Sequence, residues 1–222
     1  MEETPGRARG RRRNAIWRVC QIMLQNVMTL GLQYRARGQE RLPDGPALLL
    51  INHQSFLDPL LAALPLPRPV SYLARDNLFR VPVIGWILRQ TYVMPIRRNA
   101  AGTEALRESL RRLEAGYYVG VFPEGTRTRD GSLGPLKPGF LALARRAACP
   151  VIPVAIAGAF EAFPRGAVLP RPRRVRVVYG EPIPPAEIAG LSNREDEQAF
   201  LRLVAQRMGA CLAEAEAWRR TS

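Results

Sequence analysis

The chain has 222 residues, of which 47% are hydrophobic, and a formal net charge of +14. This length and apolar content suffice for one domain with a substantial core, and they exclude a globally disordered chain. The positive charge narrows the classes of partner to nucleic acid, an anionic lipid surface or acidic substrates. The three cysteines are widely spaced and form no metal-ligand pattern, so we expect reduced, buried thiols in a cytosolic setting and no metal site.

The first predicted element is an apolar helix behind a basic tail. Five arginines precede the stretch from Asn14 to Tyr34, which is mostly apolar but is interrupted by Arg18, Gln21 and Gln25. A membrane-spanning helix needs ~20 predominantly apolar residues, and these interruptions fall too close together for one. No small-residue cleavage site follows, which disfavours a signal peptide. The stretch is either an amphipathic helix in the membrane interface or a helix packed on the core behind a disordered tail.

The only histidine of the chain lies in the sequence Asn52-His53-Gln54-Ser55-Phe56-Leu57-Asp58. The apolar run at 47–51 predicts a buried strand before it, and residues 59–64 predict a helix after it. With Ser55 as N-cap, Asp58 falls in the first helical turn, where its carboxylate can reach the His53 imidazole. The pattern therefore predicts a His53–Asp58 pair at the carboxyl end of a strand. Taken alone, it also fits a capping box beside a loop histidine.

A second strand, predicted at 117–122, opens into a loop that contains Glu124, Gly125, Thr126 and Arg127. If the two strands are parallel, both loops leave the same edge of the sheet, where ligands of open α/β folds bind. Gly125 lets the backbone approach a ligand, Thr126 offers a hydroxyl, and Arg127 carries a planar fork suited to two phosphate oxygens. The sequence thus predicts a phosphate site beside a base.

The remaining segments indicate a scaffold. We expect a helix at 103–115, a proline- and arginine-rich loop at 164–174, a partly exposed strand at 175–180, and a last helix capped by Ser192 or Asn193. The apolar stripe of that helix is expected to be core. The predicted fold class is α/β: a single domain with a mixed, largely parallel sheet flanked by helices, preceded by an N-terminal amphipathic helix.

The two motifs together resemble the first and third motifs of the PlsC-like glycerolipid acyltransferases, which acylate lysophosphatidic acid. The segment Val93–Arg98 is similar to the second motif, with Arg98 as its arginine, and Val151–Val154 is similar to the fourth. Lys137, the only lysine of the chain, lies in a segment that is similar to the lysine-glycine step of the family. The similarity covers about residues 38 to 185. The chain departs from the pattern at Thr128, where many members have serine, and at Arg97, where many have an acidic residue.

The resemblance implies an enzyme in which His53 is the general base on a free glycerol hydroxyl and Asp58 orients it. Backbone N–H groups near the start of the following helix would hold the oxyanion. Ser55, as a nucleophile, is the weaker alternative. The residues implied in phosphate binding are Arg98, Glu124, Gly125, Thr126, Arg127 and Lys137. No cofactor is implied, because acyl-CoA or acyl carrier protein serves as cosubstrate.

The resemblance also implies that the two parts of the chain have different roles. Residues 1–37 would be a basic tail and membrane-associating helix, and residues 38–222 the catalytic domain, at the cytoplasmic face of the cell membrane. The apolar run at 78–88 is either buried core or lines the acyl-chain groove. The acceptor is lysophosphatidic acid, giving phosphatidic acid, or another lysolipid such as lyso-ornithine lipid. A nucleic-acid-binding protein remains the alternative of a different class, disfavoured because no helix-turn-helix, RNP or finger pattern is present.

Overall fold

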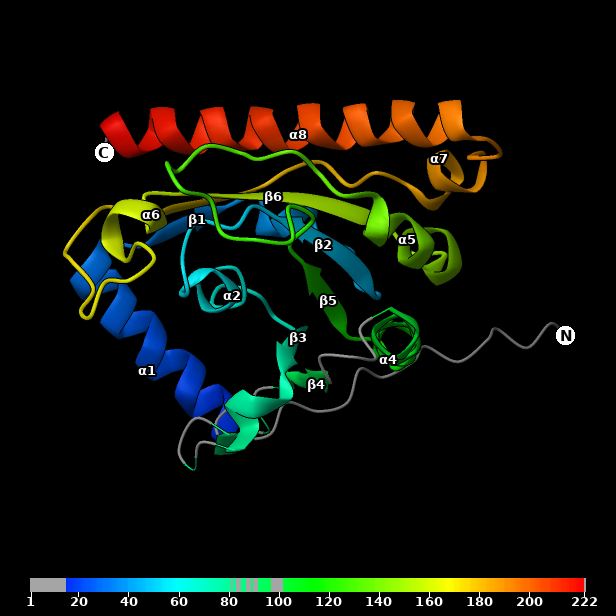
Figure 1. The fold of residues 1–222 in the computed structure, drawn as a ribbon. Helices are drawn as coiled ribbons and strands as arrows, with labels where there is room; N and C mark the ends of the chain where they lie inside the picture. The colour runs from blue at the N-terminus through cyan, green and yellow to red at the C-terminus, as the bar shows by residue number, and fades with distance from the viewer. Residues whose placement is uncertain are drawn as a thin grey trace, which may run out of the picture.

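The computed structural model of the protein describes residues 15–80, 82, 85, 86, 89, 92–96 and 102–221. In this part of the chain, a seven-stranded sheet lies between two layers of helices (Figure 1). The strand order is β1-β7-β6-β2-β5-β3-β4, and every neighbouring pair is parallel except β6 and β7. The predicted α/β fold with a mixed, largely parallel sheet is confirmed.

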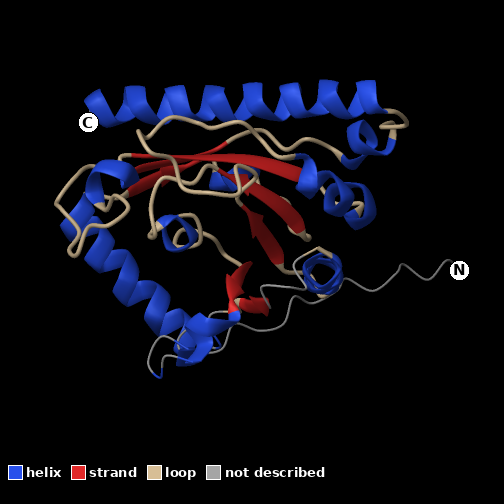
Figure 2. Cartoon of the chain, in the orientation of Figure 1, coloured by secondary structure: helices blue, strands red, loops and turns tan. Residues whose placement is uncertain are grey.

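Figure 2 distinguishes the helices, strands and loops, and the labels and colours of Figure 1 give their order along the chain. The strands are β1 (Arg35–Arg37), β2 (Ala47–Ile51), β3 (Val70–Arg75), β4 (Met94–Ile96), β5 (Tyr118–Val121), β6 (Val151–Ala157) and β7 (Arg176–Tyr179). The helices are α1 (Ala15–Leu32), α2 (Asp58–Leu61), α4 (Thr103–Glu114), α5 (Leu141–Ala147), α6 (Ala159–Ala162), α7 (Pro185–Ala189) and α8 (Arg194–Thr221). Three short 3-10 turns are η1 (Gln39–Arg41), η2 (Asp76–Arg80) and η3 (Pro138–Phe140).

The central strand β2 is buried on both faces. Leu49 and Ile51 pack into the core cluster on the side of α1 and α2, whereas Leu48 and Leu50 pack into the cluster beneath α4, α5 and α8. Side chains of a strand alternate between the two faces, so a strand that is covered on both sides has an unbroken apolar sequence. This is why the run at 47–51 predicted a strand correctly.

The last helix, α8, covers β6 and β7 on one face of the sheet (Figure 1). Oδ1 of Asn193 accepts hydrogen bonds from the backbone N–H groups of Glu195 and Asp196, which confirms the predicted N-cap. The predicted apolar stripe of this helix contributes four side chains to the buried core: Phe200, Val204, Met208 and Cys211. Cys211, on this stripe, and Cys149 are free, buried thiols, as expected.

The first helix, α1, has two apolar faces. Leu24 and Met28 pack against the core on one face, and there the side-chain amide of Gln21 donates to the carbonyl oxygens of Leu64 and Leu66. On the opposite face an apolar stripe is exposed to solvent: Val19, Ile22, Met23, Val27 and Leu30. α1 therefore packs on the domain, as one of the two alternatives expects, and the placement of its outward apolar stripe in a membrane stays a prediction. None of the helices in the described part of the chain is long and apolar enough to span a bilayer.

Three segments differ from the expectation. Residues 35–37, assigned to the N-terminal segment, form β1 and pair with β7 in the sheet. The helix expected at 59–64 is shorter, because α2 ends at Leu61, and the prolines at 65 and 67 disfavour helical backbone for the residues before them. The strand expected to be partly exposed, β7, is buried along its whole length. In the apolar run at 78–88, residues 78–80 belong to η2, residues 82, 85 and 86 are helical, and the other five lie outside the described residues.

Candidate active site

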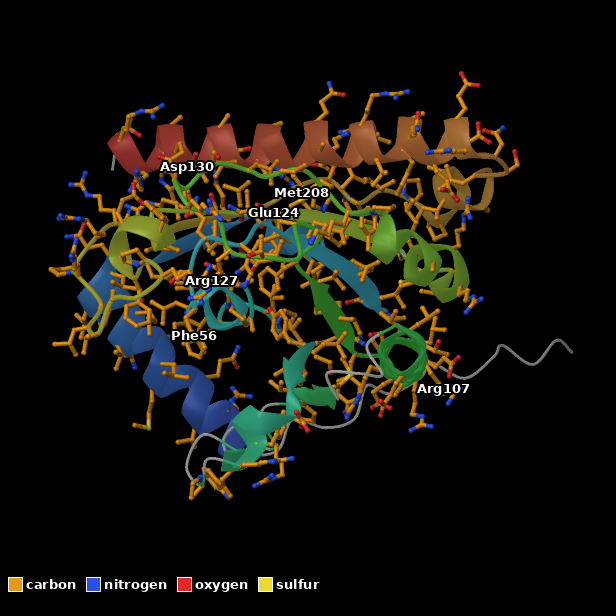
Figure 3. All side chains as sticks on the ribbon, viewed as in Figure 1. Phe56, Arg107, Glu124, Arg127, Asp130 and Met208 are labelled. Carbon is orange, nitrogen blue, oxygen red and sulfur yellow. The ribbon has the colours of Figure 1, made fainter. Side chains whose placement is uncertain are left out.

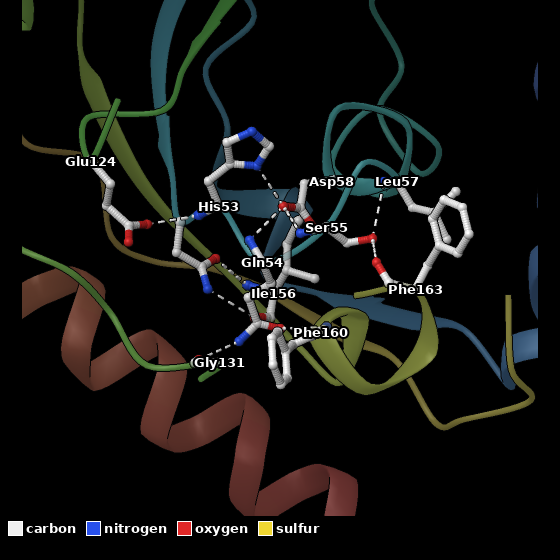
Figure 4. A network of polar contacts seen from close by, with 11 residues as sticks. His53, Gln54, Ser55, Leu57, Asp58, Glu124, Gly131, Ile156, Phe160 and Phe163 are labelled. Carbon is white, nitrogen blue, oxygen red and sulfur yellow. Dashed lines mark hydrogen bonds and ion pairs between the residues drawn. The ribbon is translucent and has the colours of Figure 1, made fainter. Parts of the chain in front are cut away.

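Two loops meet at the carboxyl edge of the central strands. β2 and β5 are parallel neighbours, with Leu50 aligned to Val121. The segment that carries His53 and the segment that carries Glu124 therefore start side by side (Figure 4). The prediction that both would face one edge of the sheet is confirmed.

His53 and Asp58 form the predicted pair. Nδ1 of His53 lies 2.8 Å from Oδ2 of Asp58, and the same oxygen accepts the backbone N–H groups of Gln54 and Ser55, each at 2.6 Å. The carboxylate is fully buried, while the imidazole side chain keeps 21% of its surface exposed. Since Nδ1 is engaged by Asp58, Nε2 is the ring nitrogen that remains for a substrate hydroxyl (Figure 4).

Burial dominates the electrostatics of Asp58. Loss of solvent raises the pKa of this carboxyl, while the hydrogen bonds from His53 and from the backbone at Ser55 and Gln54 act in the opposite direction. Within the described residues, the second carboxyl oxygen, Oδ1, is buried without a hydrogen-bond partner. A proton gained by His53 would place a positive charge against this buried carboxylate, so the pair is suited to stabilise an imidazolium.

Ser55 has a structural role that differs from the expected one. Its hydroxyl donates to the carbonyl oxygen of Phe163 at 2.8 Å and accepts the N–H of Leu57 at 3.2 Å. The residue at the N-cap position of α2 is Leu57 rather than Ser55, because the helix begins only at Asp58. With its proton directed to Phe163 and away from His53, the hydroxyl is not activated as a nucleophile.

The same contacts determine which backbone N–H groups remain to bind the oxyanion of an acyl-transfer reaction. The N–H groups of Gln54 and Ser55 donate to Asp58, and that of Leu57 donates to Ser55. Three of the N–H groups near the start of α2, which the sequence analysis expected to hold an oxyanion, are therefore already engaged within the loop.

Glu124 joins the two loops. Its Oε1 accepts the backbone N–H of His53 at 2.7 Å, and its Oε2 accepts the backbone N–H of Gly134 at 2.8 Å. Burial raises the pKa of this carboxyl, and these hydrogen bonds oppose the rise. The side chain is buried and its two oxygens are engaged by the backbone. Glu124 therefore fixes the backbone of the residue with the base, in place of the phosphate contact expected from the family resemblance.

Three further contacts hold the loops together. The N–H of Thr128 donates to the carbonyl oxygen of His53 at 2.8 Å. The side-chain amide of Gln54 donates to the carbonyl oxygen of Gly131 at 2.7 Å. The ring of Phe122 stacks on the His53 imidazole with 4.2 Å between centroids. Sequence reasoning missed Gln54 and Phe122, although both stand inside the motifs, because their roles depend on residues of the other loop.

The remaining predicted phosphate ligands lie around the exposed part of the second loop. Gly125 has φ +69°, a backbone conformation that favours glycine, and a Cβ there would lie 2.9 Å from Nζ at the flexible end of the Lys137 side chain. Thr126 is exposed and Arg127 is half-buried, and Arg127 has no acidic partner within the described part of the chain. Figure 3 shows Arg127 near α2, between Glu124 and Phe56 in that view. Arg98 lies outside the described residues.

Comparison with known proteins places these motifs in a family. A family model described as Acyltransferase matches residues 33–157. The 1-acyl-sn-glycerol-3-phosphate acyltransferase of Pseudomonas aeruginosa is 32% identical over 200 residues, which cover 86% of this chain and 77% of that protein. A chloroplastic enzyme of the same name from Brassica napus is 34% identical over 152 residues, which cover 66% of this chain. The chain spans only 44% of the length of that plant relative.

A solved structure agrees with these sequence matches. The 1-acyl-sn-glycerophosphate acyltransferase PlsC from Thermotoga maritima superposes with a TM-score of 0.78 at 26% sequence identity, covering 92% of this chain and 81% of that chain. The match extends beyond the two motifs to most of the fold. The resemblance inferred from the motifs is confirmed, and the chain belongs to the acyltransferase family.

Proposed function

We propose that this protein transfers a fatty acyl group from an acyl thioester to the free hydroxyl of lysophosphatidic acid, producing phosphatidic acid. The observation that carries the proposal is the His53–Asp58 pair, held by Glu124 against the loop that bears Arg127. The relatives named for acylation of 1-acyl-sn-glycerol 3-phosphate support the choice of acceptor.

In the proposed reaction His53 acts directly on the acceptor. Nε2 takes the proton of the glycerol hydroxyl as its oxygen attacks the thioester carbonyl, and Asp58 stabilises the imidazolium that forms. The tetrahedral intermediate collapses, the carbon–sulfur bond breaks, and the thiolate takes the proton from Nε2. The acyl group never becomes attached to the protein, which agrees with the structural engagement of Ser55. The chemistry needs no cofactor, since the acyl thioester is a cosubstrate.

The phosphate of the acceptor would bind to the second loop. Arg127 offers two parallel N–H donors, and Lys137, whose side chain lies against Gly125, adds a compact charge. The missing side chain of Gly125 lets the phosphate approach the backbone. Arg98 is a further candidate from the sequence resemblance.

The membrane part of the proposal concerns α1. Its exposed apolar stripe would lie in the interface of the bilayer, at the cytoplasmic face of the cell membrane, where the lysolipid resides. Replacement of two exposed members, Val27→Ser with Leu30→Ser, should weaken co-sedimentation with anionic vesicles and leave the thermal melt unchanged. A loss of the cooperative melt would instead make these residues part of the core.

The experiment that tests the reaction is an acyl-transfer assay of the purified protein. Lysophosphatidic acid, lysophosphatidylcholine and lyso-ornithine lipid are offered in turn, each with acyl-CoA and with acyl carrier protein as donor. We expect phosphatidic acid as the main product, and a rate loss on the order of 10²–10⁴ in His53→Ala. If the protein acylates only a different lysolipid, that lysolipid is the acceptor in place of lysophosphatidic acid. Wild-type turnover in His53→Ala would refute the mechanism, and salt-sensitive nucleic-acid binding without transfer would favour the other class.

A further inference from the structure

Among the described residues outside α1, the most exposed large apolar side chains lie in the loop between α6 and β7, residues 163–175. Val168 and Leu169 at its tip expose 89% and 74% of their surface. Two adjacent large apolar side chains with this exposure are unfavourable in water, because the transfer of each side chain out of water lowers the free energy. A contact that removes the tip from water is therefore expected.

Four arginines flank this tip in the sequence, Arg165, Arg171, Arg173 and Arg174, which we call the collar. All four are exposed, and no acidic residue occurs between Glu161 and Glu181 in the sequence. An exposed apolar tip flanked by guanidinium groups without acidic neighbours in the sequence matches the layered chemistry of an anionic bilayer, in which phosphates cover an apolar interior. An aqueous acidic surface would match the arginines alone and leave the tip unexplained.

Hydrogen bonds and prolines restrain the backbone of the loop. The N–H of Arg171 donates to the carbonyl oxygen of Ala162 at 2.7 Å, and that of Ala167 donates to Pro164 at 3.1 Å. Prolines at 164, 170 and 172 restrict the backbone further. Little conformational entropy is lost when such a loop binds, so its two apolar side chains keep most of their transfer free energy.

The base of the loop lies next to the carboxyl end of α1. Its last residue, Val175, donates its N–H to the carbonyl oxygen of Leu32 at 3.0 Å, and Nε of Arg174 donates to the side chain of Gln33 at 3.2 Å. Leu30, two residues before the end of α1, is 85% exposed. Figure 1 shows the loop beside this end of the helix. The loop that carries Val168 and Leu169 therefore starts beside the end of α1 that carries Leu30.

From these observations we infer that the tip of the 163–175 loop inserts into the interfacial region of an anionic bilayer, with the collar arginines on lipid phosphates. This second contact rests on the membrane part of the proposed function and extends it. One helix leaves the domain free to rotate about the helix axis, whereas a helix and a separate loop fix its orientation. The base of the loop is joined to the catalytic segment, because Ser55 donates to the carbonyl oxygen of Phe163.

The test is vesicle co-sedimentation of the full chain, without donor or acceptor, on phosphatidylglycerol-containing and pure phosphatidylcholine vesicles. The variant Val168→Ser/Leu169→Ser should lose roughly tenfold or more in affinity for both, because two apolar side chains no longer leave water. The swap Val168→Leu/Leu169→Val keeps the tip apolar and should bind within twofold of wild type. Exposure of both residues means that neither change should alter the melt.

The arginines are tested separately. Arg171→Gln/Arg173→Gln should lose about tenfold or more in affinity for the anionic vesicles, because two attractions to lipid phosphate are removed, and little for the neutral ones. The matched control, Arg202→Gln/Arg207→Gln, removes the same charge from exposed positions on α8, on the other face of the sheet, and should stay within twofold at physiological salt. A loss of equal size in the control would show that net charge, and not the collar, drives binding.

A depth measurement completes the test. Leu169→Trp should gain blue-shifted emission over the wild-type protein on vesicles and should be quenched by lipids brominated in their acyl chains. Unchanged affinity of Val168→Ser/Leu169→Ser, or no quenching, would overturn the inference. So would a variant that keeps vesicle binding but loses binding to acyl carrier protein. Because the assay uses no substrate, failure of the proposed reaction leaves its outcome untouched.

Discussion

The backbone N–H of His53 and Oε1 of Glu124 form a hydrogen bond of 2.7 Å, so the residue with the base is held by a side chain from the opposite loop. The other oxygen of this carboxylate accepts the N–H of Gly134, beyond Arg127 in the sequence. Glu124 therefore links the position of the base to the fold of the loop that would bind the phosphate. A change at Glu124 should alter chemistry and substrate binding together.

We predict that Glu124→Gln lowers both stability and turnover. Glutamine has the same shape but only one acceptor oxygen, so the N–H of His53 or of Gly134 loses its partner. An unsatisfied buried donor costs about 1–3 kcal/mol of unfolding free energy. Urea denaturation and steady-state kinetics should show a lower midpoint, a lower kcat and a raised KM for the lysolipid. Glu187→Gln, at an exposed position on α7, is the matched control and should behave as wild type. Wild-type stability and kinetics in Glu124→Gln would show that the two hydrogen bonds accepted by Glu124 are dispensable.

Asp58→Asn should damage catalysis more than binding. The amide oxygen can still accept the N–H groups of Gln54 and Ser55, but the negative charge that stabilises the imidazolium of His53 is gone. We expect kcat to fall on the order of 10²-fold or more, with KM for the lysolipid little changed. A variant with lowered affinity and normal kcat would assign Asp58 to binding instead.

The parts of this site that were predictable are the local ones. His53 and Asp58 are five positions apart on one strand–turn–helix unit, so their contact follows from short-range geometry. The contacts of Glu124 with His53 and of Gln54 with Gly131 join two loops that the chain reaches only after folding. No residue pattern within either loop encodes them.

The same reasoning applies to the sheet. β2 and β5 were predictable because strands with apolar neighbours on both sides have unbroken apolar sequences. The edge strand β1 reads Arg-Ala-Arg and the other edge strand, β4, contains a proline, so neither has the composition or alternation of a typical strand. Their pairing is imposed by the neighbouring strands β7 and β3.

Arg127→Lys tests the phosphate assignment. Lysine keeps the positive charge but lacks the fork that binds two oxygens at once. We expect a raised KM for lysophosphatidic acid, a smaller change in KM for the acyl donor, and a nearly unchanged melt, since Arg127 has no acidic partner among the described residues. If the KM for the donor rises instead, the loop binds the thioester.

Asp130 provides a pH-dependent prediction close to the same loop. The hydroxyl and N–H of Ser132, with the hydroxyl of Thr128, lower the pKa of Asp130 to about 2 from its ordinary 3.8. The folded state therefore favours the ionised form, and the resulting stabilisation is complete above about pH 4 and is lost as the pH falls through 2. In a carboxyl NMR titration, Ser132→Ala should raise the pKa of Asp130 toward 3.8. Asp196, whose pKa is lowered by Ser192, should not respond to Ser132→Ala and serves as the internal control. If the pKa of Asp130 is the same in Ser132→Ala as in the wild type, Ser132 is not the cause of the lowered pKa.

Three buried tyrosines on the α2 side of the sheet predict opposite responses to the same substitution. The hydroxyls of Tyr34 and Tyr179 donate to the carbonyl oxygens of Leu61 and Ala62 at 2.8 and 2.7 Å. The hydroxyl of Tyr72 is buried without a partner within the described residues, and its ring crosses Gly120, where a side chain would collide with it. Tyr34→Phe and Tyr179→Phe should each lower the unfolding free energy by about 1 kcal/mol, because a hydrogen bond is lost.

Tyr72→Phe should instead be neutral or stabilising, since it removes a desolvated hydroxyl that makes no bond. Burial and the nearby Asp58 carboxylate both raise the pKa of Tyr72, so its hydroxyl stays neutral throughout the working range. The three variants are compared by their midpoints in urea at equal denaturant slope, which holds the unfolded state constant. If Tyr72→Phe destabilises the protein as much as the other two, its hydroxyl has a partner in solution. The unsatisfied Oδ1 of Asp58 is the candidate, and Tyr72→Phe would then also lower kcat by disturbing the carboxylate that orients His53.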